Sequence, residues 1–575
     1  MESFLDILSR HAAARPDKTA YLMLNDFGAE VDCLTYAELD RDARSIAAAL
    51  SALIAPQDRA LLLHSAGLNF IRAFMGCQYA GVVAVPASLP SRKGQHRKRV
   101  EHVIEDAGAR VVITEDRLVD DIRSWLKDTP HAGLPIVTTS ECLSSDAAGW
   151  VRRKSDGDIA FIQYTSGSTG QPKGVVVRHS NILHNSELIR EAMGYSETLM
   201  GGGWLPNFHD MGLIGLILQP AFVGGTSILM SPTSFIKRPA NWLKMISKYR
   251  IESSGGPNFG YEHCLSRIQE QDVAGVDLSC WRLCFSGSEP VREDTIERFL
   301  ARFGRYGLAA NAFYPCYGMA ETTLFVAGGK SGVRHRTVVV DADKLENNQV
   351  VAAGPGSARR QTMISCGTAP GFDLAIVDPT TQRRLDAGQV GEVWLRGESV
   401  AAGYWKKPDL TRDIFGAVLQ DEPGLKWLRT GDLGFVDRGE LFICGRLKDV
   451  IIVAGRNIYP QDIEARVLEL HPSLQGGDVA AFGMDAGGSQ SVAIVFEVSP
   501  KELGDESLEK LVTLIRGTIA AEFGAPVARV VIAAKGSIAR TTSGKLQRRE
   551  TQRLLESGRI TTIWDDLAEK ASDAA

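Results

Sequence analysis

The sequence predicts an α/β protein with a large N-terminal part and a small α+β C-terminal part. The chain has 575 residues, too many for one hydrophobic core, which indicates at least two domains. Between residues 35 and 113, apolar strand-like runs alternate with helical patterns, as in a mainly parallel sheet covered by helices. A further set of strands and helices follows residue 460. These observations favour a multi-part α/β domain followed by a smaller domain.

The spacing of apolar residues predicts the N-terminal elements in order. Apolar residues recur at helical spacing in three segments, which are expected to be helices: 4–8, 35–53 and 70–80. Three short, continuous apolar runs are expected to be buried strands: 60–63, 82–85 and 111–113. Because helices separate the strands, they are expected to pair in parallel through βαβ units.

Composition excludes several classes of protein. Hydrophobic residues make up 44% of the chain and charged residues 23%, and the net charge is −5, so a surface built for nucleic acid is not expected. The nine cysteines form no C-x-x-C pair, which predicts reduced thiols in a cytoplasmic protein. The N-terminus lacks a signal peptide's apolar core, and prolines and glycines interrupt the apolar stretch 212–230, so we expect a buried segment and no transmembrane helix.

The glycine-rich segment 164–174, YTSGSTGQPKG, is the strongest single signal. Apolar runs at 159–162 and 175–177 flank it, which predicts two strands joined by a loop. Such a loop can turn backbone N–H groups and hydroxyls toward phosphate, and Lys173 adds a positive charge. It is not a Walker A motif, because Gly174 follows the lysine where that motif has Ser or Thr. The alternative is an ordinary flexible hairpin.

This segment resembles the phosphate loop of the acyl-adenylate-forming superfamily, and the resemblance extends over nearly the whole chain. It implies the superfamily's fold, a large N-terminal α/β domain (1–447) and a mobile α+β domain (448–575) joined by a hinge. It implies that the loop binds ATP phosphates through seven residues: Thr165, Ser166, Gly167, Ser168, Thr169, Gly170 and Lys173.

Later motifs carry the resemblance further. GWLPNFHDMGLIG contains His209, which by itself would usually be a packed core histidine; the resemblance gives it a catalytic role beside the acyl and phosphate sites. Residues 254–261, SGGPNFGY, are expected to form a glycine-proline turn, and the resemblance implies that this stretch lines the acyl pocket. The implied acyl-pocket residues are Met211, Gly256 and Phe259. FYPCYGMAET and the preceding SGSEP imply nucleotide contacts at Ser288, Tyr317, Gly318, Met319, Ala320 and Glu321. Glu321, with Thr165, is the implied ligand set for Mg²⁺.

The C-terminal motifs complete the implied site. Asp432, in a predicted turn, corresponds to the carboxylate that holds the ribose hydroxyls, and Arg446 to a ribose or phosphate contact. Lys448 corresponds to the hinge pivot. Beyond it, helices are predicted at 460–470 and 508–523, and strands at 479–482, 492–498 and 530–533. The loop SGK implies that Lys545 is the catalytic lysine that also contacts ATP.

One stretch separates this chain from common acyl-CoA synthetases. Somewhere within residues 329–370 the chain resembles the fatty acyl-AMP ligases, which carry an insertion thought to restrain the C-terminal domain. The resemblance implies activation of a medium- or long-chain fatty acid with ATP and Mg²⁺, then transfer to the phosphopantetheine of an acyl carrier protein, with poor use of free coenzyme A. The alternatives are a fatty acyl-CoA synthetase and a catalytically idle nucleotide- or lipid-binding relative. A P-loop kinase or ATPase does not fit the loop.

Overall fold

The computed structural model describes residues 3–90, 94–151, 158–165, 172–474, 477–486, 489–498, 508–541 and 544–566. The chain forms two compact units. Unit 1 comprises Met1–Arg336, Ser365–Leu374 and Leu395–Arg429, and unit 2 comprises Thr337–Ile364, Ala375–Trp394 and Thr430–Ala575. All nine cysteines are free thiols, as predicted. Among the described residues, no helix has the length and apolar character needed to cross a membrane.

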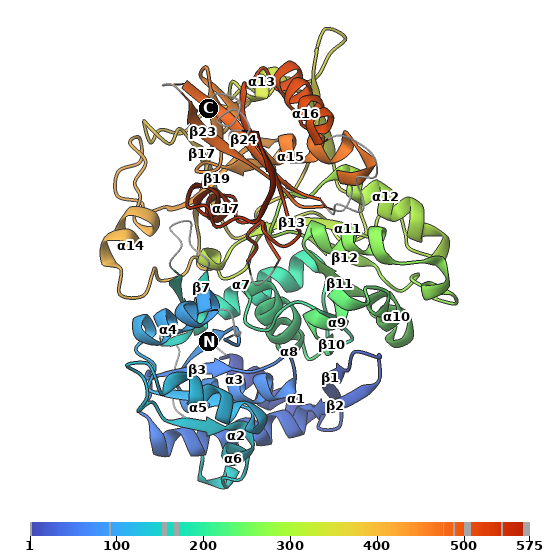
Figure 1. The fold of residues 1–575 in the computed structure, drawn as a ribbon. Coiled ribbons are helices and arrows are strands. Elements are labelled where there is room, and N and C mark those ends of the chain that lie inside the picture. Colours follow the sequence, from blue (N-terminus) through green and yellow to red (C-terminus); the bar gives the residue numbers. More distant parts are fainter. Residues whose placement is uncertain are drawn as a thin grey trace. The chain divides into compact units, whose positions relative to one another are not determined.

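The first sheet of unit 1 has six strands in the order β6-β5-β3-β4-β7-β8. Two of them, β3 and β7, are labelled in Figure 1. All neighbours are parallel except β7 and β8, which form the antiparallel pair predicted around the glycine-rich loop. The strands are β3 (Arg59–Leu63), β4 (Val83–Ala87), β5 (Val111–Thr114), β6 (Ile136–Thr138), β7 (Ile159–Thr165) and β8 (Lys173–Arg178). The predicted strands and their parallel pairing are therefore confirmed.

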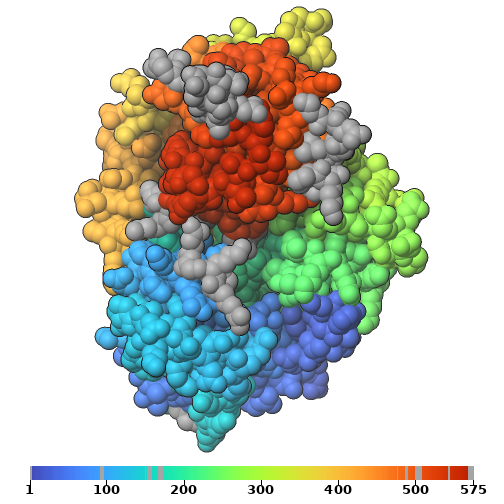
Figure 2. Space-filling model, in the orientation of Figure 1, coloured from blue at the N-terminus to red at the C-terminus, as the bar shows by residue number. Residues whose placement is uncertain are grey.

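Helices cover this sheet because each presents an apolar stripe. α2 (Tyr36–Leu53) begins at a capping box formed by Thr35 and Glu38, and it packs against α3 (Leu68–Ala80). α4 (Gly94–Ala107) and α5 (Val119–Leu126) place their apolar residues in the core formed with β3, β4 and β5. In Figure 2 the described atoms of this part of the chain, blue to cyan, lie together on the face shown.

The second sheet of unit 1 has eight strands in the order β14-β13-β12-β11-β9-β10-β1-β2. Its central neighbours are parallel, and the edge strands β2 and β14 are antiparallel to their neighbours. The strands are β1 (Thr19–Leu24), β2 (Glu30–Thr35), β9 (Met200–Gly203), β10 (Thr226–Met230), β11 (Ser253–Gly256), β12 (Leu283–Ser286), β13 (Phe313–Gly318) and β14 (Phe325–Gly328).

The remaining helices of unit 1 connect or cover these strands. They include α1 (Phe4–Ala14), α7 (His179–Met193), α8 (Gln219–Val223), α9 (Pro232–Lys237), α10 (Ala240–Tyr249), α11 (Asn258–Arg267), α12 (Glu293–Phe303) and α14 (Pro408–Phe415). The apolar stretch 212–230 is largely buried, as predicted: it forms most of the π-helical segment Met211–Leu218, then α8 and β10.

Two predicted turns are wrong. Residues 254–261 were expected to form a glycine-proline turn, but β11 ends at Gly256 and α11 begins at Asn258, so that only Pro257 joins a strand to a helix. Asp432 was expected in a turn, but it lies within β19 (Leu428–Asp437), where it pairs with Arg446 of β20 (Glu440–Arg446). β11 pairs with the distant strands β9 and β12, and β19 pairs with the following strand β20, so that strand pairing outweighs the local preference of glycine for turns.

Unit 2 consists of small sheets and three long helices. Residues 337–364, inside the predicted insertion region, form the hairpin β15 (Thr337–Asp341) and β16 (Arg360–Ile364), with α13 (Ala342–Leu345) between them. The other strands are β17 (Asp373–Val377), β18 (Gly391–Arg396), β19, β20, β21 (Ile451–Val453), β22 (Arg456–Ile458), β23 (Val479–Ala486), β24 (Ser489–Glu497), β25 (Val527–Ala533) and β26 (Thr562–Asp565).

The helices of unit 2 confirm the predicted α+β pattern. The three longest in the described parts of this unit are α15 (Pro460–Glu469), α16 (Leu508–Phe523) and α17 (Arg548–Glu556). Ile463, Val467 and Ile515 pack with β23 and β24 in one core. The predicted domain boundary after residue 447 concerns motion about a hinge and stays a prediction.

Candidate active site

The carboxyl ends of four neighbouring strands gather most of the predicted site residues of unit 1. β9, β11, β12 and β13 are adjacent in the eight-stranded sheet, and β9, β11 and β12 run parallel to one another and to β13. In open α/β sheets, ligands bind beyond the carboxyl ends of the strands. The chain leaves these ends at Trp204, Pro257, Gly287 and Met319, which brings together motifs that are more than one hundred residues apart.

The predicted acyl-pocket residues lie close to one another at this edge. The Ser288 hydroxyl donates to the Met211 sulfur at 2.8 Å, and the Phe259 backbone N–H donates to Glu289 Oε1 at 2.6 Å. Ser288 has φ = +69°, a left-handed conformation that is uncommon for serine. Strained backbone of this kind persists where surrounding contacts hold it, and it clusters at functional sites.

Trp204 is part of this cluster, although the sequence argument did not single it out. Its indole is buried and stacks on Phe235 with ring centroids 3.9 Å apart, and it meets Phe259 edge-on at 5.7 Å. A Cβ at Gly256 would lie 3.0 Å from the indole, so this glycine allows the ring to approach the strand. No local pattern marks Trp204 in the sequence, because its ring contacts lie at Phe235 and Phe259, further along the chain.

His209 is held by its neighbour. Its Nδ1 lies 2.6 Å from Asp210 Oδ1, and the same carboxylate oxygen accepts the Met211 backbone N–H at 2.7 Å. Asp210 is buried, whereas His209 remains partly exposed. The pair fixes the orientation of the imidazole at the start of the π-helical segment, a form of helix that is frequent at functional sites.

The two ends of the glycine-rich loop are described, and its centre is not. Thr165 and Lys173 pair directly across β7 and β8. The predicted phosphate-binding residues Ser166, Gly167, Ser168, Thr169 and Gly170 lie outside the described residues. Burial lowers the pKa of Lys173; the nearby Glu321 carboxylate opposes this shift, and Lys407 adds to it.

Glu321 lies within reach of the same lysine and is fixed by Tyr404. The Tyr404 hydroxyl donates to Glu321 Oε1 at 2.8 Å. Lys173 Nζ lies 5.4 Å from the centroid of the Tyr404 ring. The structure therefore brings together the predicted metal ligand and the predicted phosphate-binding lysine, with a tyrosine between them that the sequence argument missed.

α7 holds the turn that carries Glu321. Asn185, fully buried on this helix, donates to Phe325 O at 2.8 Å and accepts the Phe325 backbone N–H at 3.0 Å. It also reaches Thr322 O and the Ser399 hydroxyl. Thr323 has φ = +70°, a strained value for a β-branched residue, and its hydroxyl donates to Ser399 O at 2.8 Å.

The predicted nucleobase residues follow β13. Tyr317 is largely buried, with its hydroxyl directed at the sulfur of Met319, and Ala320 begins the short helical turn that contains Glu321. Gly318 is among the predicted nucleotide contacts. A Cβ at residue 318 would lie 1.8 Å from Leu324 O, so packing against the chain's own backbone already requires glycine there.

In unit 2, Asp432 and Arg446 face each other across β19 and β20. Arg446 Nε lies 3.2 Å from Asp432 Oδ1, and the carboxylate is buried while the guanidinium is exposed. Lys448 follows in the next turn, and its backbone carbonyl accepts from Arg549 at 2.7 Å. Burial lowers the pKa of Lys448 to about 8. The nearby Arg446 and Arg549 cations add to this shift, and the Asp449 and Asp432 carboxylates oppose it.

The described ends of the Lys545 loop are bonded to each other. The Lys545 backbone N–H donates to the Thr541 hydroxyl at 2.9 Å, and the Thr541 N–H donates to Lys545 O at 2.8 Å. Arg540 pairs with Asp478 at the base of the loop.

α17 is anchored just after this loop. Arg548 makes two hydrogen bonds of 2.7 Å to the buried Glu464 carboxylate and lies 3.5 Å from Asp449. Burial by itself would lower the pKa of Arg548, but these carboxylates raise it above its ordinary value.

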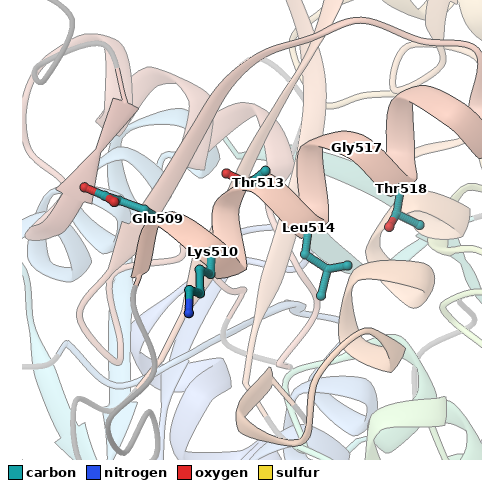
Figure 3. Close-up of a pocket in the computed structure, with 6 residues that line it drawn as sticks. All are labelled: Glu509, Lys510, Thr513, Leu514, Gly517 and Thr518. Atoms are coloured by element: carbon teal, nitrogen blue, oxygen red, sulfur yellow. The ribbon is translucent and has the colours of Figure 1, made fainter.

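A surface hollow of unit 2 is lined by none of these residues. It follows α16 and is lined by Glu509, Lys510, Thr513, Leu514, Gly517 and Thr518 (Figure 3). All six lining residues come from one face of a single helix, and none belongs to a predicted motif, so we assign it no part in the site.

Comparison with known proteins identifies the family. The AMP-binding enzyme family matches residues 8–405. The medium-chain-fatty-acid–[acyl-carrier-protein] ligase JamA of Moorena producens is 39% identical over 554 residues, which covers 95% of this chain and 94% of that protein. The 4-hydroxyphenylalkanoate adenylyltransferase of Mycobacterium marinum is 37% identical, covering 95% of this chain and 90% of that protein.

Solved structures agree. A fatty acyl-adenylate ligase from L. pneumophila, in complex with acyl adenylate and pyrophosphate, has a TM-score of 0.76, 35% identity and 98% coverage of both chains. A structure from studies of fatty acyl-adenylate ligases from E. coli and L. pneumophila has a TM-score of 0.88 and 30% identity, covering 97% of this chain and 98% of that chain. The predicted fold and the resemblance to this group are confirmed: the chain belongs to the AMP-binding enzyme family.

Proposed function

We propose that this enzyme joins a medium- or long-chain fatty acid to AMP and passes the acyl group to the phosphopantetheine thiol of an acyl carrier protein in the cytoplasm. The observation that carries the proposal is the Lys173–Tyr404–Glu321 cluster beside the end of β7, which offers a cation and a carboxylate to a nucleotide. The similarity to a medium-chain-fatty-acid–[acyl-carrier-protein] ligase over 95% of the chain supports the choice of substrate and acceptor.

The first step requires no general base. A fatty acid is ionised at neutral pH, so its carboxylate oxygen can attack the α-phosphorus of ATP directly. The new P–O bond forms as the bond to the β-phosphate bridging oxygen breaks, and that electron pair leaves with pyrophosphate. Both reactants are anions, so catalysis depends on positioning and on neutralising charge.

The proposed roles follow from charge. Lys173, Thr165 and the loop between them hold the β- and γ-phosphates, and Tyr317, Gly318, Met319 and Ala320 border the base. Asp432 accepts hydrogen bonds from the ribose hydroxyls, and Arg446 contacts the ribose or a phosphate. Lys545 neutralises the charge that develops on the acyl and α-phosphate oxygens. Ser288 also lies on the nucleotide side. His209, oriented by Asp210, borders the reacting groups, and Met211, Gly256 and Phe259 line the acyl side.

The residues fit a nucleotide-bound Mg²⁺. Glu321 presents a partly exposed carboxylate whose Oε1 is already oriented by Tyr404, and a hard oxygen donor of this kind, together with the Thr165 hydroxyl, suits the ion. No group of three acidic, histidine or cysteine side chains in the described parts of the chain could hold a metal alone, which favours a metal that arrives with ATP. When bound, Mg²⁺ would neutralise phosphate charge.

We also propose that the enzyme prefers a carrier protein to coenzyme A as the acceptor of the acyl group. Glu346, in the predicted insertion region, is buried, and its carboxylate binds Arg359 at 2.7 Å and Arg456 at 3.0 Å. Asn457 donates to Asn348 at 2.8 Å. These bonds tie residues 346–359 to residues just beyond the predicted hinge, which supports a restraint on its motion. An acyl-CoA synthetase is the competing function.

The testing experiment compares thiol acceptors. The protein is incubated with ATP, Mg²⁺ and a C12 fatty acid, then with coenzyme A or a phosphopantetheinylated carrier protein, and acyl-AMP is followed. We expect acyl-AMP to persist with coenzyme A and to be consumed by the carrier. Rapid formation of acyl-CoA would identify an acyl-CoA synthetase, and no adenylate with any chain length would favour an idle relative.

A further inference from the structure

Tyr404 lies on a segment held on both sides by the proposed nucleotide site. Residues 402–405 form three backbone hydrogen bonds with β8: Val176 N to Gly403 O, Ala402 N to Val176 O and Trp405 N to Gly174 O, at 2.7–2.9 Å. On the other side, the Ala401 N–H donates to Glu321 O at 2.9 Å. The segment is therefore tied both to the strand that carries Lys173 and to the turn that carries Glu321.

The Tyr404 side chain is itself well anchored. Its ring meets Phe415 of α14 edge-on at 5.1 Å, and its backbone N–H donates to the Thr411 hydroxyl at 2.9 Å. From this position the hydroxyl donates to Glu321 Oε1, and the ring face lies 5.4 Å from Lys173 Nζ. One side chain thus contacts the carboxylate and the ammonium group at the same time.

Each contact has a known physical effect. A hydrogen bond to a metal-binding carboxylate fixes its orientation, and losing such a partner typically weakens metal affinity by 10–100-fold. An aromatic face attracts an ammonium group and limits the positions that a flexible lysine side chain can take. The direct Lys173–Glu321 attraction could otherwise draw the two charges together and away from ATP.

We propose that Tyr404 is a positioning residue that holds Glu321 for the metal bound with ATP and Lys173 for the phosphates. The inference rests on the proposed nucleotide site, because it assigns Tyr404 no role apart from these two residues. The hydroxyl contributes to the ATP affinity that depends on the metal, and the ring contributes to the ATP affinity that depends on Lys173. The two parts can be separated by substitution.

The test measures ATP binding by calorimetry, once with Mg²⁺ and once with EDTA, and uses no acyl substrate. For Tyr404→Phe we expect the dissociation constant of ATP with Mg²⁺ to rise roughly tenfold, while binding in EDTA is unchanged. For Tyr404→Leu, which also removes the ring, binding should weaken under both conditions. The matched control is Tyr79→Phe, which removes a 2.7 Å hydrogen bond from another tyrosine to a carboxylate, that of Asp40; it should change neither value.

A double-mutant cycle with Glu321→Gln completes the test. If Tyr404 acts through Glu321, adding Tyr404→Phe to Glu321→Gln should cost no further affinity for ATP with Mg²⁺. Wild-type affinity in Tyr404→Phe, an equal loss in EDTA, or an undiminished loss in the Glu321→Gln background would each overturn the inference. Wild-type protein that binds no ATP under either condition would instead overturn the proposed function. Thermal melting confirms that each variant is folded.

Discussion

Lys545 shows how a single residue can be identified by motif and yet depend on its local structure. Its loop is closed by the two hydrogen bonds with Thr541 and by the Arg540–Asp478 pair, so its backbone position is well defined. In the proposed mechanism its ammonium group matters only as charge develops during adenylation.

We expect Lys545→Ala to slow acyl-AMP formation by roughly 10²–10³, the loss seen when one preorganised electrostatic donor is removed, with little change in ATP affinity. The measurement is the single-turnover rate of acyl-AMP formation. Lys535→Ala, on an exposed lysine of the same unit, is the control. A near-normal rate in Lys545→Ala would remove this residue from the mechanism.

His64 makes stability depend on pH. It is buried at the end of β3, 2.9 Å from the Thr139 hydroxyl, and burial lowers its pKa to about 4. In the unfolded chain a histidine binds a proton near pH 6.5, so the unfolded state takes up the proton first. The contribution of neutral His64 to the free energy of unfolding is therefore fully present above pH 6.5 and is lost as the pH falls toward 4.

The difference between the pKa of His64 in the unfolded chain, 6.5, and in the folded protein, about 4, predicts that the free energy of unfolding falls by up to about 3 kcal/mol across that range. The measurement is urea unfolding at pH 7 and pH 5 for wild type and His64→Gln. The variant should lose less stability between the two pH values than wild type. His96→Gln, at an exposed position, should behave as wild type. The same loss of unfolding free energy between pH 7 and pH 5 in all three proteins would contradict the prediction.

At the scale of elements, α7 acts as a scaffold for the Glu321 turn. Two buried asparagines on this helix donate hydrogen bonds to different segments. Asn185 donates to the turn, and Asn181 donates to Glu398 O and Val400 O on the neighbouring segment. A buried side chain with several hydrogen bonds leaves its partners unsatisfied when it is removed.

Asn185→Ala should therefore lower stability by roughly 2–4 kcal/mol and also weaken binding of ATP with Mg²⁺, because the strained turn at Thr323 loses its support. Asn181→Ala is the matched control: it should lower stability but leave ATP binding unchanged. Denaturant unfolding and calorimetry measure the two effects. Equal ATP affinity in both variants would show that α7 does not position the Glu321 turn.

At the scale of the whole molecule, the contacts of residues 337–364 within unit 2 bear on the choice of acceptor. The Glu346 carboxylate joins two arginines, one before and one after the predicted hinge. If these bonds restrain the C-terminal domain, breaking them should release a motion that thioester formation with free coenzyme A requires.

We expect Glu346→Ala to raise acyl-CoA formation several-fold relative to acyl transfer to the carrier, and deletions within 332–358 to act in the same direction. Asp343→Ala, which removes a more exposed partner of Arg359, is the control. The measurement is the ratio of the two thioester products at equal acyl-AMP. An unchanged ratio would mean that the insertion region does not set acceptor choice.

The sequence alone determined much of the protein. Apolar patterning placed five strands of the six-stranded sheet, all but β6, and the helices α2, α3, α15 and α16, since burial of an apolar stripe is a local property of the pattern. The glycine-rich loop and the later motifs pointed to the family, because short motifs preserve the backbone and charge requirements of a site.

Only the tertiary structure decided which distant residues meet. Tyr404, Asn185 and Trp204 carry no local signal strong enough to mark them, since their importance comes from partners far along the chain. The wrong prediction of a turn at residues 254–261 has the same cause, because β11 pairs with β9 and β12. At Asp432 and Gly318 the deciding contacts are nearer in the sequence, with β20 and with Leu324 O, but they too form only in the folded structure. The sequence thus fixes which groups are available, and long-range packing fixes which of them act together.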